Sequence, residues 1–151
     1  MQETDIAVHI DRFMRGIHGG LNARAADFDT EHVGPGGGKL LMTIADIEPA
    51  PMQQVARLMA RDKSQMTRAI KALENKGLVQ RASDPGDARV TLLQLTRKGR
   101  RTVERIQKAL GEVIGELLSP LGAEERRLLG TLMARVDPLT AEAQRCGTGS
   151  A

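Results

Sequence analysis

Residues 62–99, DKSQMTRAIKALENKGLVQRASDPGDARVTLLQLTRKG, decide the fold of this chain. The first part of the stretch predicts a helix over residues 63–76, because its apolar residues recur at steps of three and four. Asp62 is a favourable N-cap for that helix. Gly77 followed by Leu78 is typical of the Schellman motif that ends a helix. The sequence therefore predicts one helix with both of its ends defined.

The second part of the stretch has the pattern of a β-hairpin. Residues 78–82 and 90–95 are rich in aliphatic and β-branched residues and predict two strands. Between them lies Asp84-Pro85-Gly86-Asp87, with proline second and glycine third, which favours a type II turn. Thr96 is suited to cap a long helix that runs to about Leu118. A hairpin with a protruding basic loop is therefore expected between two helices.

A short helix is expected before this stretch. Glu48-Pro49-Ala50-Pro51 separates it from the preceding segment, and Pro51 suits the first turn of a helix, where its missing N–H costs nothing. Met52, Val55 and Met59 form the apolar stripe of this short helix. Two helices joined by a tight turn and followed by a basic hairpin have the order of a winged helix-turn-helix. We therefore expect a mainly α fold with a small β-hairpin wing.

Helical segments flank this lobe on both sides. Residues 4–27 and 97–118 have apolar residues at helical spacing, and residues 123–145 predict a last helix that Pro138 kinks or divides. The run Val33-Gly34-Pro35-Gly36-Gly37-Gly38 predicts a break before a further short helix. The expected organisation is a DNA-binding lobe over residues 39–96, a helical dimerisation region over residues 1–33 and 97–145, a Gly-rich linker over residues 34–38, and a flexible tail over residues 146–151.

The composition is that of a globular protein with an aliphatic core. Apolar residues make up 40% of the 151 residues and charged residues 27%, but aromatic residues only 1%. The longest apolar runs are far shorter than the roughly 20 residues needed to cross a bilayer, and Met1 to Asp5 lack the basic start of a secretory signal. The single cysteine, Cys146, excludes a disulfide within this chain. We therefore expect a cytoplasmic protein without a membrane segment.

Positive charge is concentrated in the lobe. The chain carries a net charge of +3, but residues 57–105 contain thirteen Lys and Arg against five Asp and Glu, a net charge of +8. The remaining residues together carry −5. A basic segment is often only a solvated surface, but on a helix-turn-helix and a hairpin it favours an anionic partner.

The helix over residues 63–76 presents a polar face opposite its apolar stripe. The candidate DNA-binding residues come from this face and from the hairpin: Ser64, Gln65, Thr67, Arg68, Lys71, Arg81, Asp87 and Arg89. Gln65, Arg68 and Lys71 have the donors that read base edges in the major groove. The two hydroxyl-bearing residues and Arg81 are better suited to phosphate oxygens. An ordinary exposed helix has a similar face, so the hairpin is needed to complete the argument.

The hairpin tip carries Arg89. The minor groove admits a thin extended arm, and its negative potential attracts arginine. Asp87, two residues earlier, can hold the guanidinium group in place. The tip is therefore expected to bind the minor groove.

The order and spacing of these residues resemble the DNA-binding core of the MarR family of bacterial regulators, from about Met52 to Arg100. The resemblance rests on four motifs: Ser64-Gln65-Met66-Thr67-Arg68, Leu73-Glu74-Asn75-Lys76-Gly77-Leu78-Val79, Asp87-Ala88-Arg89 and Leu95-Thr96-Arg97-Lys98-Gly99. It implies a homodimer in which the first helix and the last two interlock. It also implies that Arg89 enters the minor groove and that Asp87 orients it. Upstream, the run Gly34-Pro35-Gly36-Gly37-Gly38 departs from the family, and no effector-binding residues are carried over.

Other kinds of site are weaker. The segment from Gly34 to Lys39 lacks the spacing of a Walker motif, and His9 and His18 project from nearly opposite sides of their helix. The patch of Asp27, Asp29, Glu31 and His32 is the least poor metal candidate, although a solvated turn is favoured. No Ser/His/Asp or Cys/His set can be assembled. We therefore expect no enzyme activity, no cofactor and no metal.

The sequence thus predicts a homodimeric regulator that binds double-stranded DNA at an inverted repeat. We expect it to act as a repressor, with a small-molecule effector as a further partner. The apolar stripes of the first helix and the long helix would expose a large surface on a monomer, which favours a partner subunit. The alternative is a winged-helix module that uses the same surface to bind another protein.

Overall fold

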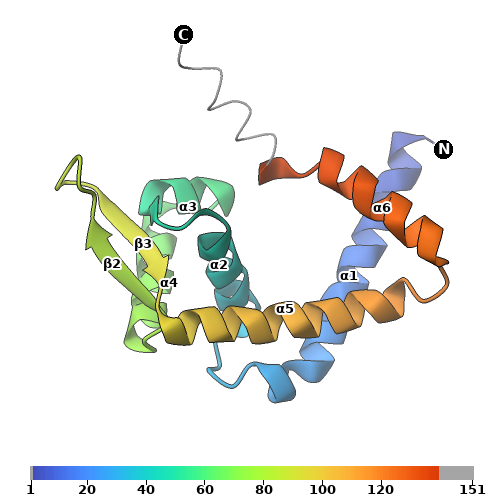
Figure 1. Cartoon of the computed structure of the whole chain (residues 1–151), viewed down its shortest axis with the longest axis horizontal. Helices are drawn as coiled ribbons and strands as arrows, with labels where there is room; N and C mark the ends of the chain where they lie inside the picture. Colours follow the sequence, from blue (N-terminus) through green and yellow to red (C-terminus); the bar gives the residue numbers. More distant parts are fainter. Residues whose placement is uncertain (1, 140–151) are drawn as a thin grey trace, which may run out of the picture. The chain divides into compact units, whose positions relative to one another are not determined.

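The fold is mainly helical with one small sheet, as the sequence predicts. The computed structural model describes residues 2–139. Its elements follow in the order α1 (Glu3–Phe28), α2 (Gly34–Ile47), β1 (Ala50–Pro51), α3 (Met52–Leu58), α4 (Lys63–Asn75), β2 (Val79–Ser83), β3 (Thr91–Leu95), α5 (Arg97–Leu117) and α6 (Ala123–Arg135) (Figure 1). Residues 1–113 form one compact unit, which contains the candidate nucleic-acid interface and the cavity described below, and α6 belongs to a second unit.

The sheet has the strand order β1-β3-β2 and is antiparallel throughout. In the hairpin, Val79 pairs with Leu95 and Ser83 pairs with Thr91. The hairpin extends away from the helices beside it (Figure 1). Strand β1 was not expected, because it has two residues, one of which is a proline. It pairs at the edge of β3, where Ala50 lies opposite Leu93, and an edge is where a strand tolerates proline.

The core lies between α2, α3, α4, the sheet and the first half of α5. It is aliphatic, as the composition predicts, and its fully buried side chains are Leu40, Leu41, Ile44, Val55, Met66, Ile70, Leu78 and Leu93. Val103 and Ile106 of α5 close the core from the other side. The two helices of the helix-turn-helix are thus fixed by one continuous apolar cluster.

The glycine-rich run is the start of a helix and not a linker. Helix α2 begins at Gly34, so the predicted break over residues 34–38 is wrong. The carboxylate of Asp29 accepts the backbone N–H groups of Val33 and Gly34, each at 2.9 Å, and so satisfies donors that a helix start leaves open. A Cβ on Gly37 would lie 2.9 Å from the Cβ of Val33, and Gly38 is buried. Close packing therefore accounts for glycine at position 37, whereas a Cβ on Gly38 would make an ordinary contact of 3.6 Å with Ile106.

Both predicted ends of α4 are confirmed. The Asp62 carboxylate accepts the backbone N–H of Gln65 at 2.8 Å. At the other end, the N–H of Leu78 donates to the carbonyl of Leu73 at 3.0 Å, and Gly77 has a φ of 71°. This is the bond and the left-handed residue that a Schellman motif requires.

Helices α1 and α6 have no buried residue within one chain. On α1, the side chains Ile6, Ile10 and Met14 are about half exposed. On α6, Leu128 and Met133 are more than half exposed, and so is Val136, which follows the last residue of the helix. Much of the apolar surface of both helices is therefore exposed to solvent within a single chain.

The prediction that Pro138 divides the last helix is confirmed. Helix α6 ends at Arg135, and residues 138–139 are helical again, with the Asp137 carboxylate accepting the N–H of Leu139 at 2.9 Å. Residues 140–151, with Cys146, the end of the expected dimerisation region and the expected tail, lie outside the described residues. No helix in the described part of the chain has the length and apolar character needed to span a membrane.

Candidate nucleic-acid interface

The outward face of α4 has the arrangement that its sequence predicts. Met66, Ile70 and Leu73 are buried against the core. The five candidate residues of this helix are all exposed: Ser64, Gln65, Thr67, Arg68 and Lys71. The burial of one side therefore fixes the direction in which the other side presents its donors.

The cations on this face are available to a partner. Among the residues that the structure describes, neither Arg68 nor Lys71 forms an ion pair. The hydroxyl of Thr67 differs, because it donates to the carbonyl of Lys63 at 2.8 Å. Its oxygen can still accept, but its proton is already bonded within the helix. Thr67 is thus the less suitable of the two hydroxyl-bearing residues for donating to a phosphate.

The hairpin tip is ordered by two aspartates. The Asp84 carboxylate accepts the N–H of Gly86 at 2.7 Å. The Asp87 carboxylate accepts the N–H of Arg89 at 3.0 Å, and the same oxygen lies 3.4 Å from the Nε of that arginine. The contact expected between Asp87 and Arg89 is therefore present, while the Arg89 side chain remains 93% exposed. The exposed Arg89 guanidinium, held at its Nε by Asp87, can therefore reach into a groove of DNA.

The type II turn expected at the tip is wrong. Such a turn needs a positive φ at its third residue, and Gly86 has none. Aspartate side chains that bond to a backbone N–H two residues further on form turns of their own. The Asp84 carboxylate does this with Gly86, and this bond replaces the turn that the Pro-Gly pair suggests.

Arg81 lies in a different environment from the other candidates. Its guanidinium forms an ion pair with Glu74, so the side chain bridges β2 and α4. The pair leaves 37% of the Arg81 side chain and 22% of the Glu74 side chain exposed. The structure thus gives Arg81 a role in fixing the hairpin against α4, in addition to the phosphate contact that the sequence suggests.

The base of the hairpin contains residues whose importance sequence reasoning missed. The Thr96 hydroxyl donates to the carbonyl of Gly77 at 2.6 Å and accepts the N–H of Gly99 at 3.0 Å. The carboxylate of Glu48 accepts the N–H of Leu95 at 2.7 Å and forms an ion pair with Arg100. Thr96 was expected as a helix cap, but its bond to the end of α4 depends on a contact 19 residues away. These bonds connect the start of α5 to the ends of α4 and α2.

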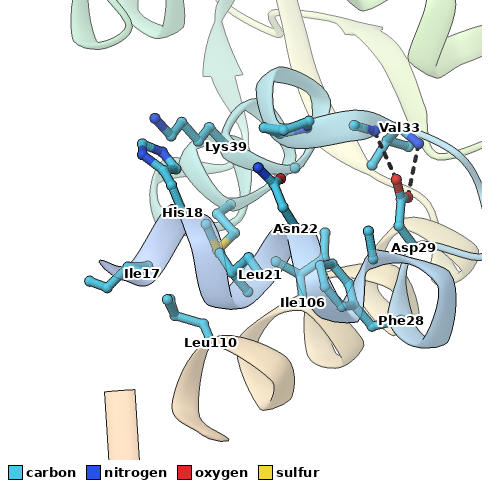
Figure 2. Close-up of a pocket in the computed structure, with 15 residues that line it drawn as sticks. Ile17, His18, Leu21, Asn22, Phe28, Asp29, Val33, Lys39, Ile106 and Leu110 are labelled. Carbon is cyan, nitrogen blue, oxygen red and sulfur yellow. Dashed lines mark hydrogen bonds between the residues drawn. The ribbon is translucent and has the colours of Figure 1, made fainter. Parts of the chain in front are cut away.

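A cavity of about 160 Å³ lies between α1, α2 and α5. Its lining is mostly apolar and comes from Ile17, Leu21, Ala25, Phe28, Val33, Pro35, Met42, Ile106 and Leu110. Polar groups are few: Lys39 and His18 lie at one end, Asn22 lies between them and Phe28, and Asp29 lies at the other end (Figure 2). The Asp29 carboxylate is occupied by its two backbone bonds. The sequence pattern did not reveal this cavity, because its walls come from three separate helices.

The structure gives the weak metal candidate near residue 29 a different role. Within residues 2–139, no three His, Cys, Asp or Glu side chains gather as a metal site requires. Asp29 caps α2, and the side chain of Glu31 forms ion pairs with Lys98 and Arg105.

A helix-turn-helix on one core, with an exposed polar α4 and a projecting hairpin, defines a winged helix-turn-helix protein. Comparison with known proteins gives the family. Residues 37–91 match the model of the MarR family. An HTH-type transcriptional regulator of Bacillus subtilis, YxaD, is 31% identical over 98 residues, which are 65% of this chain and 68% of YxaD. The chain belongs to the MarR family, which confirms the resemblance seen in the sequence.

Two further comparisons agree with this assignment. The HTH-type transcriptional regulator YdgJ of Bacillus subtilis is 37% identical over 97 residues, which are 64% of this chain and 57% of YdgJ. The chain thus spans little more than half of that relative. A crystal structure of a mutant MarR from E. coli complexed with operator DNA has the same fold, with a TM-score of 0.62 and 21% identity over 91% of this chain and 100% of that one. Both Bacillus subtilis relatives are described as HTH-type transcriptional regulators, in agreement with the prediction that the chain is not an enzyme.

Proposed function

We propose that this chain is a homodimeric repressor that binds a specific inverted repeat in double-stranded DNA. One observation carries the proposal: the exposed polar face of α4 adjoins a hairpin whose tip is an exposed arginine. The major groove is about 12 Å wide and admits one helix, whose side chains then meet base edges. The family relative solved with operator DNA supports the same partner for this chain.

The roles of the individual residues follow from their chemistry and exposure. Gln65, Arg68 and Lys71 are assigned to base edges, because they carry donors and are exposed on α4. Ser64 is assigned to a phosphate oxygen, since it lies in the first turn, where the partial positive charge of the helix favours an anion. Arg89 is assigned to the minor groove, and its contact with Asp87 limits the directions that the guanidinium takes.

The exposed apolar residues of α1 and α6 support a dimer. Helix α1 is 26 residues long and buries none of them within the chain, although Ile6, Ile10 and Met14 repeat on one face. A contiguous apolar surface of this kind marks an interaction site. A second copy of the chain offers the same surface, and a two-fold axis matches it with itself. A two-fold dimer then presents two copies of α4 to two half-sites.

Selection of bound fragments from random duplex DNA tests the proposal. We expect the selected sequences to contain an inverted repeat whose half-sites are about one helical turn apart. The logarithm of the affinity for this sequence should fall linearly with the logarithm of the salt concentration, with a slope of about −0.9 for each phosphate neutralised. Selected sites with a single half-site would contradict the dimer. Failure to retain any duplex at low salt would favour the alternative that the surface binds a protein.

Replacing Arg68 with alanine should weaken binding to the selected site by about 1–3 kcal/mol and relax the base preference at one position of each half-site. The reason is that arginine offers a planar pair of donors to guanine. Arg68→Lys is the matched variant, because it keeps the charge but loses the planar pair. Fluorescence anisotropy with the site and its single-base variants measures both effects. If Arg68→Lys keeps the full preference, Arg68 contacts a phosphate and not a base.

The cavity between α1, α2 and α5 is the proposed site of a small-molecule effector. Its apolar walls fit the body of a small organic molecule, and Lys39, His18 and Asn22 can fix a polar group at one end. Effector binding at this place would change the affinity for DNA only if the effector bound the DNA-free and DNA-bound forms of the chain with different affinities.

A further inference from the structure

One loop separates the cavity from the end of α4. Residues 29–33 connect α1 to α2, and two of them, Asp29 and Val33, line the cavity. Asp29 also holds the first N–H groups of α2 through its carboxylate. An occupant of the cavity would therefore touch this loop directly, at Asp29 and Val33.

The other side of the same loop is bonded to α4. The Lys76 ammonium donates to the backbone carbonyl of Glu31 at 2.8 Å, and Lys76 is the C-cap residue of α4. The Lys98 ammonium lies 3.0 Å from the Glu31 carboxylate and donates to the carbonyl of Lys76 at 2.9 Å. Glu31, Lys76 and Lys98 thus form a closed set of contacts, the Glu31 clamp, between the loop, α4 and α5.

The Glu31 carboxylate of the clamp is partly buried and has a second cationic neighbour. The Glu31 side chain is only 23% exposed, and a second cation, Arg105, lies 4.0 Å from its carboxylate. The Arg105 guanidinium donates to the buried Thr102 hydroxyl at 3.2 Å. Lys98 and Arg105 of α5 thus share one partly buried carboxylate. An uncharged side chain at position 31 would leave both cations without this negative partner.

We propose that the Glu31 clamp transmits the occupancy of the cavity to α4, so that Glu31 and Lys76 are positioning residues for DNA recognition. The inference rests on the proposed function of α4 in binding DNA. An occupant that displaces Asp29 or Val33 also displaces the Glu31 carbonyl, since the loop is short. That carbonyl is bonded to the end of α4, so α4 shifts relative to the groove that it reads.

The test fills the cavity with a larger side chain of the protein itself, so no effector is needed. Ala25 lines the cavity on α1, and Ala25→Leu adds apolar volume there at little cost in helix propensity. We expect Ala25→Leu to weaken binding to the selected duplex about tenfold, a usual size for coupling between two sites. Ala26→Leu is the matched control, because Ala26 is exposed and does not line the cavity. It should leave the affinity unchanged.

The clamp is tested by repeating the substitution in altered backgrounds. In Lys76→Met, which keeps the length of the side chain but removes its donor, Ala25→Leu should change the affinity less than about twofold. Glu31→Gln should reduce the coupling in the same direction. Lys76→Arg, which keeps a donor, should restore the tenfold effect. The comparison uses ratios within each background, so the charge lost at residue 76 cancels.

The possible outcomes are distinguishable. A parent chain that binds no duplex overturns the proposed function and the inference with it. A parent chain that binds DNA, but with an affinity that Ala25→Leu leaves unchanged, overturns the inference alone. An equal tenfold loss in the parent and in Lys76→Met shows that coupling passes through the core and not through the clamp, and also overturns it. Thermal unfolding of each variant identifies any that lose the fold, and the conservative Lys76→Arg and Glu31→Gln pair then decides the result.

Discussion

Replacing Gly99 with alanine is expected to lower the free energy of unfolding by more than about 3 kcal/mol, at the upper end of what overpacking costs in a well-packed site. A Cβ at this position would lie 2.0 Å from the carbonyl oxygen of Leu78 and 3.0 Å from its carbonyl carbon. The obstacle is backbone, and the same carbonyl accepts the N–H of Thr96 at 3.1 Å. The methyl group therefore separates α5 from the end of α4. Chemical denaturation of the purified variant, or its loss from the soluble fraction, measures the effect.

Gly111 provides the control on the same helix. A Cβ at Gly111 meets nothing within 4 Å, so Gly111→Ala should raise the free energy of unfolding by up to about 1 kcal/mol through helix propensity alone. The pair separates the general effect of alanine in α5 from the contact at Leu78. If Gly99→Ala were as stable as Gly111→Ala, the result would contradict the claim that α5 approaches the backbone of Leu78 too closely for a Cβ at position 99.

Replacing Arg89 with alanine should weaken binding to the selected duplex about ten- to a hundredfold and leave the free energy of unfolding unchanged. The Arg89 side chain is 93% exposed, and within the described residues its ion pair is with Asp87 alone. Its removal should therefore deprive the wing of the proposed minor-groove contact while the lobe keeps its core. Gel shifts at fixed salt, together with thermal unfolding, measure the two quantities separately.

Arg101 is the matched control for the wing. It is an exposed arginine in the second turn of α5, beyond the end of β3 that lies farthest from the hairpin tip. Arg101→Ala removes the same charge and should change the affinity less than about threefold, through the long-range field only. An equal loss from Arg89→Ala and Arg101→Ala would mean that net charge, and not the wing, accounts for binding.

The parts of the fold that the sequence predicts are those set by neighbouring residues. Asp62 and Gly77 define the ends of α4 through bonds to residues within a few positions. The alternation of buried and exposed positions on α4 follows from the helical period, so the sequence also predicts that the candidates from Ser64 to Lys71 are exposed, as they are. The contact of Asp87 with Arg89 is equally local.

The parts that the sequence did not predict depend on distant contacts. The start of α2 at Gly34 depends on Asp29, and on packing that makes a Cβ at Gly37 unacceptable. The rule that a run of glycines marks a break takes account of neither the Asp29 contact nor the packing at Gly37. Asp29, five residues before the run, is a local signal, but its pattern with the neighbouring acidic residues favours a solvated turn, with a metal site as the weaker interpretation. The Glu31 clamp joins residues 45 positions apart, so no local pattern reveals it.

The glycines that open α2 also determine how the cavity behaves. Gly34, Pro35 and Gly38 form one of its walls, and each glycine inside a helix costs about 1 kcal/mol relative to alanine. We therefore expect the first turns of α2 to fray at a lower free energy than the rest of the lobe. If the cavity holds the proposed effector, a wall that opens and recloses in this way would admit molecules of several sizes, and a broad range of ligands would follow from the same residues that let the helix begin.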